Sequence, residues 1–463
     1  MMIGRLPLLI LIAALTNAWA EEQERSYVNC DDGSIPFDTV PSTLAKNKIH
    51  QICPGTLPDS VPFGQPICGD GSAYSFLYAS PPEVNNKKVI LEFMGGGACW
   101  NAETCQNNGG LQILPELAAF ASGTISCKQA SNLAKNVLDF PINLLCDTTI
   151  GTTDLSEYNY VVVPYCSQDV HMGDSESNYA EEYGNDGVYH HGGHNLMSVL
   201  QWVYTHYPDP SHILVTGCSA GGTILPVVYD LLYQHYNSVE RKVNINTIID
   251  SAVYLTPSDF FDFGFPNWNP ASLLSEIGFD YDQSSGNEFY SNILWEHIIN
   301  RGSSQDKWGF LSHTHDPVSI SFYIRMGGDA EGYDSIDDAW TSKTVSFLGA
   351  ITEEYDNVDT FFINGSDHCN FGLYYGLQEA GFDEWAGDII TEQDLSTSSP
   401  TPAPTTYCST IPSKRWCLKR GCAWDRESQT CSTSGPSFCG TIPGKNLCLK
   451  NGCDWDKVSK TCS

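Results

Sequence analysis

Residues 212–222 read HILVTGCSAGG, and this stretch places Ser219 between a strand and a helix. The HILVT run is short, β-branched and largely apolar, which is typical of a strand buried on both faces of a parallel sheet. Helix-like sequence follows at 223–236, TILPVVYDLLYQHY, despite a proline near its start. Gly217 and Gly221 permit a tight turn that exposes the Ser219 hydroxyl at the positive end of that helix. The stretch therefore predicts a nucleophile elbow with Ser219 as the nucleophile.

Other strand-like runs lie on both sides of the elbow and share short length and β-branched or aromatic residues. They are AYSFLYAS (73–80), KVILEFMGGG (88–97), YVVVPYC (160–166), TIIDSAV (247–253) and TFFING (360–365). An amphipathic helix is expected at 195–207, NLMSVLQWVYTHY, directly before the elbow. Strands that alternate with helices predict an α/β protein with a mainly parallel central sheet flanked by helices. With the serine elbow, this pattern predicts the α/β-hydrolase fold.

Composition excludes several classes of protein. The chain has 463 residues, 41% of them hydrophobic, which is enough for one large domain with a hydrophobic core and a second, smaller domain. It carries 23 Lys and Arg against 55 Asp and Glu, a net charge of −32, which argues against nucleic-acid binding. Because the His-bearing spacings of zinc sites are absent, we expect no metal and no organic cofactor.

The first twenty residues predict a secretory signal peptide (1–20). Arg5 precedes an apolar run, and Ala18-Trp19-Ala20 is a small-x-small cleavage signature. The apolar runs are shorter than the roughly 20 residues that cross a bilayer, so no membrane span is expected. A secreted, extracellular protein meets an oxidising compartment, and the 18 cysteines are therefore expected to form mostly disulfides.

The C-terminal residues form two cysteine-rich repeats, 408–432 and 439–463, with identical cysteine spacings and a period of 31 residues. Each repeat has too few apolar residues for a core, so disulfides are expected to hold it, with pairings that the sequence leaves open. A Ser/Thr/Pro-rich linker, 395–407, precedes the repeats and separates them from the predicted catalytic domain, 21–394.

The repeats differ in charge from the rest of the chain. Residues from Cys408 onward carry nine basic and four acidic side chains, a net +5, which leaves −37 for everything before them. One interpretation is a tether to a carbohydrate or anionic surface, with Trp424 and Trp455 stacking on sugars. The alternative is that each tryptophan fills a small core of its own repeat.

A serine nucleophile needs a base and an acid, which follow it in the order Ser, acid, His in this fold. Of the 12 histidines, those that follow Ser219 late in the chain and lie near strand-like segments are His313, His315 and His368. His368 directly follows the last predicted strand and is the candidate base.

The acid must follow a strand and hold the imidazole in one tautomer. Asp316 lies between the strand-like WGFLSHTH (308–315) and the helix-like PVSISFYIRM (317–326), and it is the first candidate. Sequence position leaves three alternatives open, namely Asp250, Asp306 and Asp329.

An acyl-transfer site also needs hydrogen-bond donors for the developing oxyanion. MGGGACW (94–100) follows an early strand, and its glycines allow backbone N–H groups to turn inward. The N–H of Ala220, the residue after the nucleophile, would complete the oxyanion hole.

Six segments together resemble the pectin acetylesterase and Notum family of secreted serine hydrolases. They are EFMGGGACWNAETC (92–105), VPYCSQDVHMGD (163–174), the stretch from HHGG to SAGG (190–222), DSAVYLTPSDFF (250–261), HDPVSISFYIRMGG (315–328) and NGSDHC (364–369). The likeness is nearer to the pectin-acetylesterase-like branch than to the Notum carboxylesterases, which remove a palmitoleoyl lipid from Wnt proteins. The tail repeats lie outside the resemblance.

The resemblance implies specific site residues. Its triad falls on Ser219, Asp316 and His368, its oxyanion amides fall on Gly96, Gly97 and Ala220, and its substrate contacts fall on Trp100 and His171. The implied activity is hydrolysis of O-acetyl esters on an extracellular polysaccharide such as pectin, or on a glycoconjugate. Because Gly-Gly-Gly-Ala-Cys-Trp replaces the plant-like Gly-Gly-Gly-Trp-Cys, substrate identity is not inherited.

The sequence leaves two other functions open. One is a Notum-like lipid or protein O-deacylase, which predicts a long apolar pocket. The other is a catalytically vestigial carbohydrate-binding or adhesion protein, whose repeats alone would bind glycans.

Two disulfides are predicted beside the site, and the protein is expected to be a monomer. Cys99 and Cys105 are six residues apart around a tight loop, while Cys218 and Cys369 each adjoin a predicted catalytic residue. The sequon at Asn364 (Asn-Gly-Ser) is a possible glycosylation site, but we expect an unmodified turn because a glycan there would crowd His368.

Overall fold

The computed structural model describes residues 35–54, 63–83, 85–105, 149–178, 187–237, 243–253, 255–257, 259–279, 302–330, 332–369 and 379–391, with four short strands after residue 422. The chain divides into two compact units, Met1–Gln393 and Asp394–Ser463. The predicted signal peptide (1–20) and linker (395–407) lie outside the described residues.

The first unit is built on an eight-stranded sheet with the order β1-β2-β6-β3-β9-β10-β11-β12. Its strands are β1 (Ile49–Ile52), β2 (Phe76–Ala79), β3 (Lys88–Phe93), β6 (Asn159–Val163), β9 (His212–Cys218), β10 (Asn244–Asp250), β11 (Trp308–His313) and β12 (Val358–Ile363). All neighbouring pairs from β6 to β12 are parallel, and only β2 runs antiparallel to its neighbours. The prediction of a mainly parallel sheet is confirmed.

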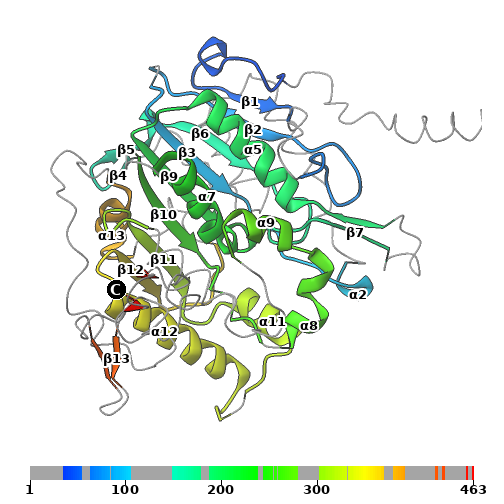
Figure 1. Cartoon of the computed structure of the whole chain (residues 1–463), viewed down its shortest axis with the longest axis vertical. Helices are drawn as coiled ribbons and strands as arrows, with labels where there is room; N and C mark the ends of the chain where they lie inside the picture. Colours follow the sequence, from blue (N-terminus) through cyan, green and yellow to red (C-terminus); the bar gives the residue numbers. More distant parts are fainter. Residues whose placement is uncertain are drawn as a thin grey trace, which may run out of the picture. The chain divides into compact units, whose positions relative to one another are not determined.

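Helices cover both faces of the sheet (Figure 1). The longer ones are α5 (Gly192–His206), α7 (Leu225–Asn237), α11 (Pro317–Arg325), α12 (Ile336–Glu354) and α13 (Phe382–Ile390). Side chains of α5 and α7 pack with Val89 and Leu91 of β3 in one cluster, whereas α13 packs with Ile90 in another. Since successive strand side chains point to opposite faces, the sheet separates two cores, as in an α/β hydrolase.

The described residues of the first unit also contain shorter elements. They are α2 (Ala102–Cys105), α6 (Ala220–Thr223), α8 (Phe260–Phe263), α9 (Ala271–Glu276), the 3-10 helices η1 (Pro41–Thr43), η4 (Leu155–Glu157) and η6 (Phe265–Trp268), and the strand pairs β4 (Thr149–Ile150) with β5 (Thr153–Asp154) and β7 (Ser175–Ser177) with β8 (Val188–His190). The helix expected at 223–236 is α7, which begins at Leu225, and the short helix α6 precedes it. Pro226 lies in the first turn of α7, where its missing N–H leaves no helix bond unmade.

The second unit contains two antiparallel hairpins at equivalent places in the repeats. β13 (Ala423–Asp425) pairs with β14 (Thr430–Ser432), and β15 (Trp455–Asp456) pairs with β16 (Thr461–Cys462). Trp424 lies opposite Cys431, as Trp455 lies opposite Cys462, in keeping with the 31-residue period. The cysteine pairings of the repeats and the surroundings of both tryptophan side chains lie outside the described part of the chain.

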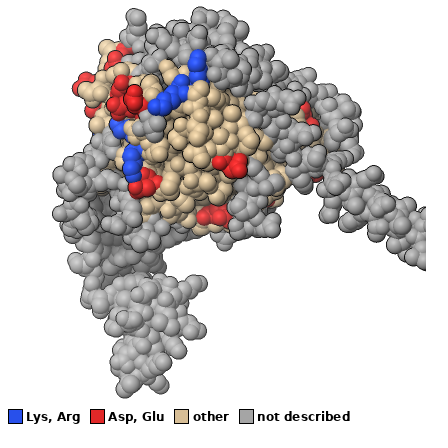
Figure 2. Space-filling model, turned by 90° about the horizontal axis from the view of Figure 1, so that it is seen from above, with Lys and Arg blue, Asp and Glu red and all other residues tan. Residues whose placement is uncertain are grey.

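Two observations concern the surface. On the face seen in Figure 2, the few basic side chains lie among acidic ones on a largely uncharged surface. Lys88, for example, pairs with Glu157 at 2.8 Å, and Lys87 pairs with Asp209. None of the helices in the described ranges combines the length and apolarity that a membrane crossing requires.

Buried neutral histidines predict an acid-sensitive fold. Burial lowers the pKa of His171 and His191 to about 4 and that of His212 to about 3. His212 is fully buried, with Nδ1 2.7 Å from the Tyr158 hydroxyl and Nε2 facing the Asn246 amide at 3.2 Å. Because these pKa values lie below the unfolded value near 6.5, the unfolded chain binds more protons between pH 6.5 and 4. The stability that these neutral histidines contribute is therefore fully present above pH 6.5 and is lost as the pH falls toward 4.

Urea unfolding between pH 7.5 and 4.5 measures this dependence. We expect the free energy of unfolding to fall by about 1.4 kcal/mol per pH unit for each such histidine. His212→Gln, which removes one titrating group, should make the slope shallower. A free energy of unfolding that is constant across this range would contradict the prediction.

Candidate active site

Ser219 lies at the turn between β9 and α6, where its backbone adopts φ 55° and ψ −128°. This left-handed conformation is strained for a residue with a Cβ atom and is typical of a nucleophile elbow. The Ser219 N–H donates to the Asp250 carbonyl at 3.0 Å, and the Ser219 carbonyl accepts from the N–H of Gly222 at 2.9 Å. These bonds to β10 and to the first turn of α6 fix the turn.

Close packing explains the glycines of the elbow. A Cβ atom on Gly217 would lie 2.5 Å from the Gly221 carbonyl oxygen, and one on Gly221 would lie 2.1 Å from the Phe93 carbonyl oxygen. Any side chain there would push α6 away from β3 and β9. The glycines therefore let the helix start directly over the strand ends.

His368 and Asp316 form a hydrogen-bonded pair. The His368 ring lies in the loop after β12, and its Nδ1 is 2.7 Å from Oδ2 of Asp316. Asp316 is fully buried at the start of α11, where Oδ1 accepts from the N–H groups of Val318 and Ser319 and Oδ2 also accepts from the Ser319 hydroxyl. Because a carboxylate only accepts, the His368 proton lies on Nδ1, and Nε2 is left to take a proton.

The other acid candidates have different partners. The Asp306 carboxylate accepts from the Tyr229 hydroxyl at 2.7 Å, and Asp329 is exposed on the surface. Asp250 lies beneath the elbow, and its carboxylate accepts from the Ser251 hydroxyl at 2.8 Å. Of the four acids considered, the structure brings Asp316 to His368.

The loop that carries His368 is held by His313 and by Ser251, of which Ser251 has no sequence signal. The Asp367 N–H donates to Nδ1 of His313 at 3.2 Å, and the Cys369 N–H donates to the Ser251 hydroxyl at 3.0 Å. The residues before and after His368 are thus each fixed by a buried side chain. His313, a base candidate in the sequence, instead supports the loop, whereas His315 is exposed.

Three disulfides lie in the described residues, namely Cys68–Cys166, Cys99–Cys105 and Cys218–Cys369. The last two are the predicted pairs. Cys218–Cys369 joins the residue before Ser219 to the residue after His368, so it links the nucleophile elbow to the base loop. Two groups of cysteine and histidine lie close enough to suggest a metal site, but their sulfur atoms are in disulfides and offer no thiolate.

Removal of the Cys218–Cys369 bond should damage stability and activity together. The double variant Cys218→Ala/Cys369→Ala is expected to lose about 2–5 kcal/mol of unfolding free energy. Ester hydrolysis should also fall by roughly 10²-fold, since small displacements of catalytic groups have large effects on rate. Urea unfolding and kcat for a nitrophenyl ester measure both effects. Cys68→Ala/Cys166→Ala is the control: it should lose similar stability but less kcat, and equal losses of kcat would contradict the prediction.

The glycine loop lies against the nucleophile. A Cβ atom on Gly95 would lie 2.6 Å from the Cys218 carbonyl oxygen and 2.8 Å from the Ser219 Cβ. Gly96 and Gly97 have φ values of 153° and 82°, which a residue with a side chain rarely adopts. Within the described residues, the N–H groups of Gly97 and Ala220 donate to no protein acceptor. They are free to donate to an oxyanion.

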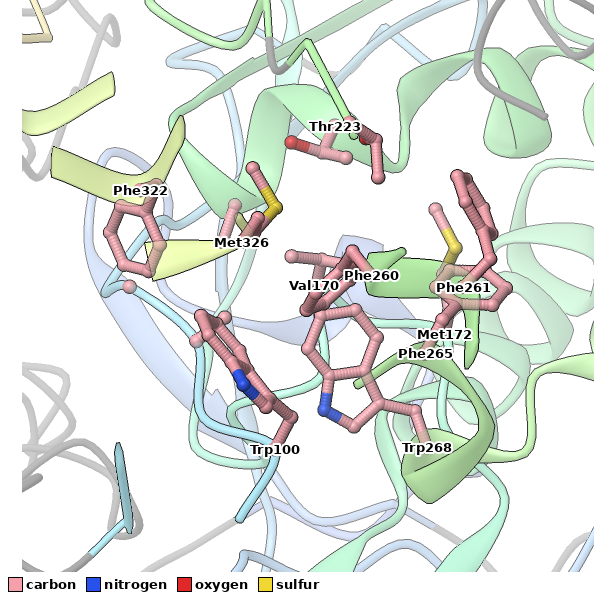
Figure 3. A pocket seen from close by; sticks show the side chains of 14 residues that line it. Trp100, Val170, Met172, Thr223, Phe260, Phe261, Phe265, Trp268, Phe322 and Met326 are labelled. Carbon is pink, nitrogen blue, oxygen red and sulfur yellow. The ribbon is translucent and has the colours of Figure 1, made fainter. Parts of the chain in front are cut away.

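An apolar pocket opens beside these amides (Figure 3). It encloses about 560 Å³, part of it open to solvent. Its walls come from the glycine loop, the 170–172 segment, α6, α8, η6 and α11, and they contain Gly97, Ala98, Trp100, Val170, Met172, Ala220, Thr223, Thr256, Phe260, Phe261, Phe265, Trp268, Phe322 and Met326. Trp100 is buried and packs edge to face with Phe260 at 4.9 Å between ring centroids. The predicted contact residue Trp100 thus forms part of the pocket wall.

The prediction that His171 contacts substrate is wrong. Its ring is buried between Phe93 and Tyr165, and Nε2 donates to the Met94 carbonyl at 2.9 Å. His171 instead supports the backbone that leads into the glycine loop. Asn364 is exposed at the end of β12, and its modification stays untested.

Comparisons with known proteins agree with the sequence resemblance. A family model described as Pectinacetylesterase matches residues 60–264. The palmitoleoyl-protein carboxylesterase NOTUM of Schmidtea mediterranea is 28% identical over 192 residues, which are 41% of this chain and 32% of that protein. The match therefore spans about a third of the relative's length. The structure of the Wnt deacylase Notum from Drosophila matches with a TM-score of 0.39 and 14% identity, and covers 68% of this chain and 84% of that chain. Residues 60–264, which are less than half of this chain, are thus similar to the pectinacetylesterase family.

Proposed function

We propose that this protein is a secreted serine carboxylesterase that removes an apolar acyl group, larger than acetyl, from an extracellular molecule. One observation carries the choice of acyl group, namely the pocket beside Gly97 and Ala220, whose walls are apolar and largely aromatic. Six aromatic side chains line this pocket, and an acetyl group, with its single methyl, would contact few of them. Aromatic walls gain free energy from each methylene group that they remove from water.

The mechanism follows from the arrangement of the polar groups. His368 Nε2 takes the Ser219 proton as the hydroxyl oxygen attacks the ester carbonyl, and Asp316 stabilises the imidazolium through Nδ1. The N–H groups of Gly97 and Ala220 donate to the oxyanion of the tetrahedral intermediate. His368 then protonates the leaving alcohol, and water releases the acyl group by the same steps in reverse order.

A second candidate is hydrolysis of O-acetyl groups on a polysaccharide such as pectin. The match to the pectinacetylesterase family model favours it, and the basic C-terminal repeats would provide a carbohydrate tether. However, residues 1–407, with a net charge of −37, repel a polyuronate within a Debye length of about 10 Å at 0.1 M salt. A neutral glycan would avoid this repulsion.

Chain-length preference tests the proposal. We would measure kcat/KM for nitrophenyl acetate, butyrate and octanoate, and acetate release from acetylated pectin, with Ser219→Ala as the inactive control. Each buried methylene group is worth about 0.8 kcal/mol, so kcat/KM should rise by about fourfold per methylene until the pocket is full. Met326→Trp narrows the pocket. It should lower kcat/KM for nitrophenyl octanoate and leave kcat/KM for nitrophenyl acetate unchanged.

The outcomes separate the candidates. A preference for acetate together with acetate release from pectin would overturn the larger acyl group and favour the second candidate. Equal, negligible activity of the wild type and Ser219→Ala on every ester would overturn both, and glycan binding by residues 408–463 would then support a vestigial binding protein.

A further inference from the structure

The 167–171 segment after β6 is strained and lies against the glycine loop. Three of its residues have left-handed φ values: Gln168 at 57°, Val170 at 50° and His171 at 62°. Such residues rarely adopt these angles, and a cluster of them persists only where the surroundings fix the backbone. The segment is therefore built to hold a particular shape.

Asp169 fixes that shape. Its carboxylate is fully buried, and Oδ1 accepts from the Ser167 hydroxyl at 2.6 Å and from the His171 N–H at 3.1 Å. Oδ2 accepts from the N–H groups of Gly173 at 3.1 Å and of Gly192, the first residue of α5, at 2.7 Å. One carboxylate thus ties the strained turn to a helix N-terminus.

The strained segment reaches the glycine loop through Gln168. The Gln168 side chain is fully buried, and its Nε2 donates to the Gly96 carbonyl at 2.9 Å. Its own backbone carbonyl accepts from the Cys99 N–H at 2.9 Å, beyond the other end of the loop. Gln168 therefore holds the loop at two points.

The bond to Gly96 sets the direction of the next N–H group. In a trans peptide unit the C=O and N–H bonds point in opposite directions, and the described chain contains no cis peptide bond. Because Gln168 holds the Gly96 carbonyl, the Gly97 N–H points away from Gln168. Gly97 lines the pocket beside Ala220. With glycine on both sides, this peptide would otherwise rotate freely and could turn its carbonyl toward the oxyanion.

We propose that Gln168 is a positioning residue that orients the Gly96–Gly97 peptide so that its N–H donates to the oxyanion. This inference rests on the proposed esterase function. Gln168 itself does not line the pocket, so it acts on the reaction only through the backbone.

The test compares Gln168→Met with a matched variant. Methionine keeps the length of the side chain but cannot donate to the Gly96 carbonyl. Asn195→Leu removes another bond from a buried amide to a backbone carbonyl, one that does not involve the glycine loop, since the Asn195 amide donates to the Ile67 carbonyl at 3.0 Å. For each variant we would measure kcat and KM on nitrophenyl octanoate, and thermal unfolding.

The decisive measurement is inhibition by a trifluoromethyl ketone, whose adduct with Ser219 places an oxyanion at the loop. The corresponding methyl ketone, which remains trigonal, is the control. For Gln168→Met, kcat and the affinity for the trifluoromethyl ketone should both fall by about 10- to 100-fold. This loss does not exceed the loss of kcat that follows removal of a whole oxyanion donor, which is about 10²- to 10³-fold. KM and methyl-ketone affinity should change by less than about threefold, because ground-state binding does not use this donor. Asn195→Leu should leave all four values within about twofold.

Each result bears on the proposal. A folded Gln168→Met with unchanged kcat and unchanged trifluoromethyl-ketone affinity overturns the role of Gln168 and leaves the esterase intact. A wild-type chain that cleaves no ester and is not labelled at Ser219 by a fluorophosphonate overturns the esterase, and the role of Gln168 with it. If Gln168→Met does not fold, Gln168→Glu replaces it, and its carboxylate should repel the Gly96 carbonyl and lower kcat further.

Discussion

Replacement of Ser219 by alanine is expected to lower kcat for ester hydrolysis by about 10⁴- to 10⁶-fold, because the proposed mechanism has no other nucleophile and triad residues act as a unit. The overall fold should be retained. The elbow is held by backbone bonds from the Ser219 N–H and carbonyl, and these do not need the hydroxyl. Single-turnover kinetics with a nitrophenyl ester measure the loss, and labelling with a fluorophosphonate should disappear in parallel.

Ser219→Gly is the matched control for strain. Alanine keeps the cost of φ 55°, whereas glycine adopts this angle readily. The glycine variant should be as inactive as the alanine variant but more stable by about 1 kcal/mol. An alanine variant that retains activity would exclude Ser219 as the nucleophile, and a glycine variant less stable than alanine would exclude strain at the elbow.

Asp316→Asn is expected to lower kcat by about 10⁴-fold, because the asparagine amide would present N–H to His368 and favour the wrong tautomer. With Nδ1 as the acceptor, Nε2 would carry the proton and could not accept one from Ser219. Stability should change little, since asparagine caps helices as well as aspartate and its Oδ1 would still accept from Val318 and Ser319.

The pH profile of kcat distinguishes this effect from a general disturbance. Activity of Asp316→Asn should recover at high pH, where hydroxide replaces the missing base, while wild-type activity reaches a plateau. Asp329→Asn, at an exposed acid that was also a candidate, should leave kcat within about twofold. Equal losses in the two variants would contradict the assignment of Asp316.

The parts of the site that could be predicted from the sequence are those with a local cause. Ser219, His368 and the glycine loop each follow a strand whose composition is recognisable by itself, and each needs residue types that the chemistry dictates. The parallel sheet was predictable for the same reason. By contrast, β1 and α12 were missed, because β1 has only four residues and the IDDAWTSKTVSFLGAITEE sequence of α12 is largely polar.

Supporting residues could not be predicted, because they act through backbone groups that are distant in the sequence. Ser251 holds the N–H of Cys369, 118 residues later, and Gln168 holds the carbonyl of Gly96, 72 residues earlier. No pattern of residue types marks such a bond. The same limit explains the error on His171, whose ring contacts Phe93 and Tyr165 from other segments.

The Cys218–Cys369 disulfide also governs when the catalytic groups come together. Its two sulfur atoms come from residues 151 apart, and each adjoins a member of the triad. In the reducing interior of a cell, the newly made chain would have its serine and its histidine on loops that no covalent bond joins. For the secreted esterase proposed above, oxidation after export would complete the alignment, and the chain would gain its activity only outside the cytoplasm.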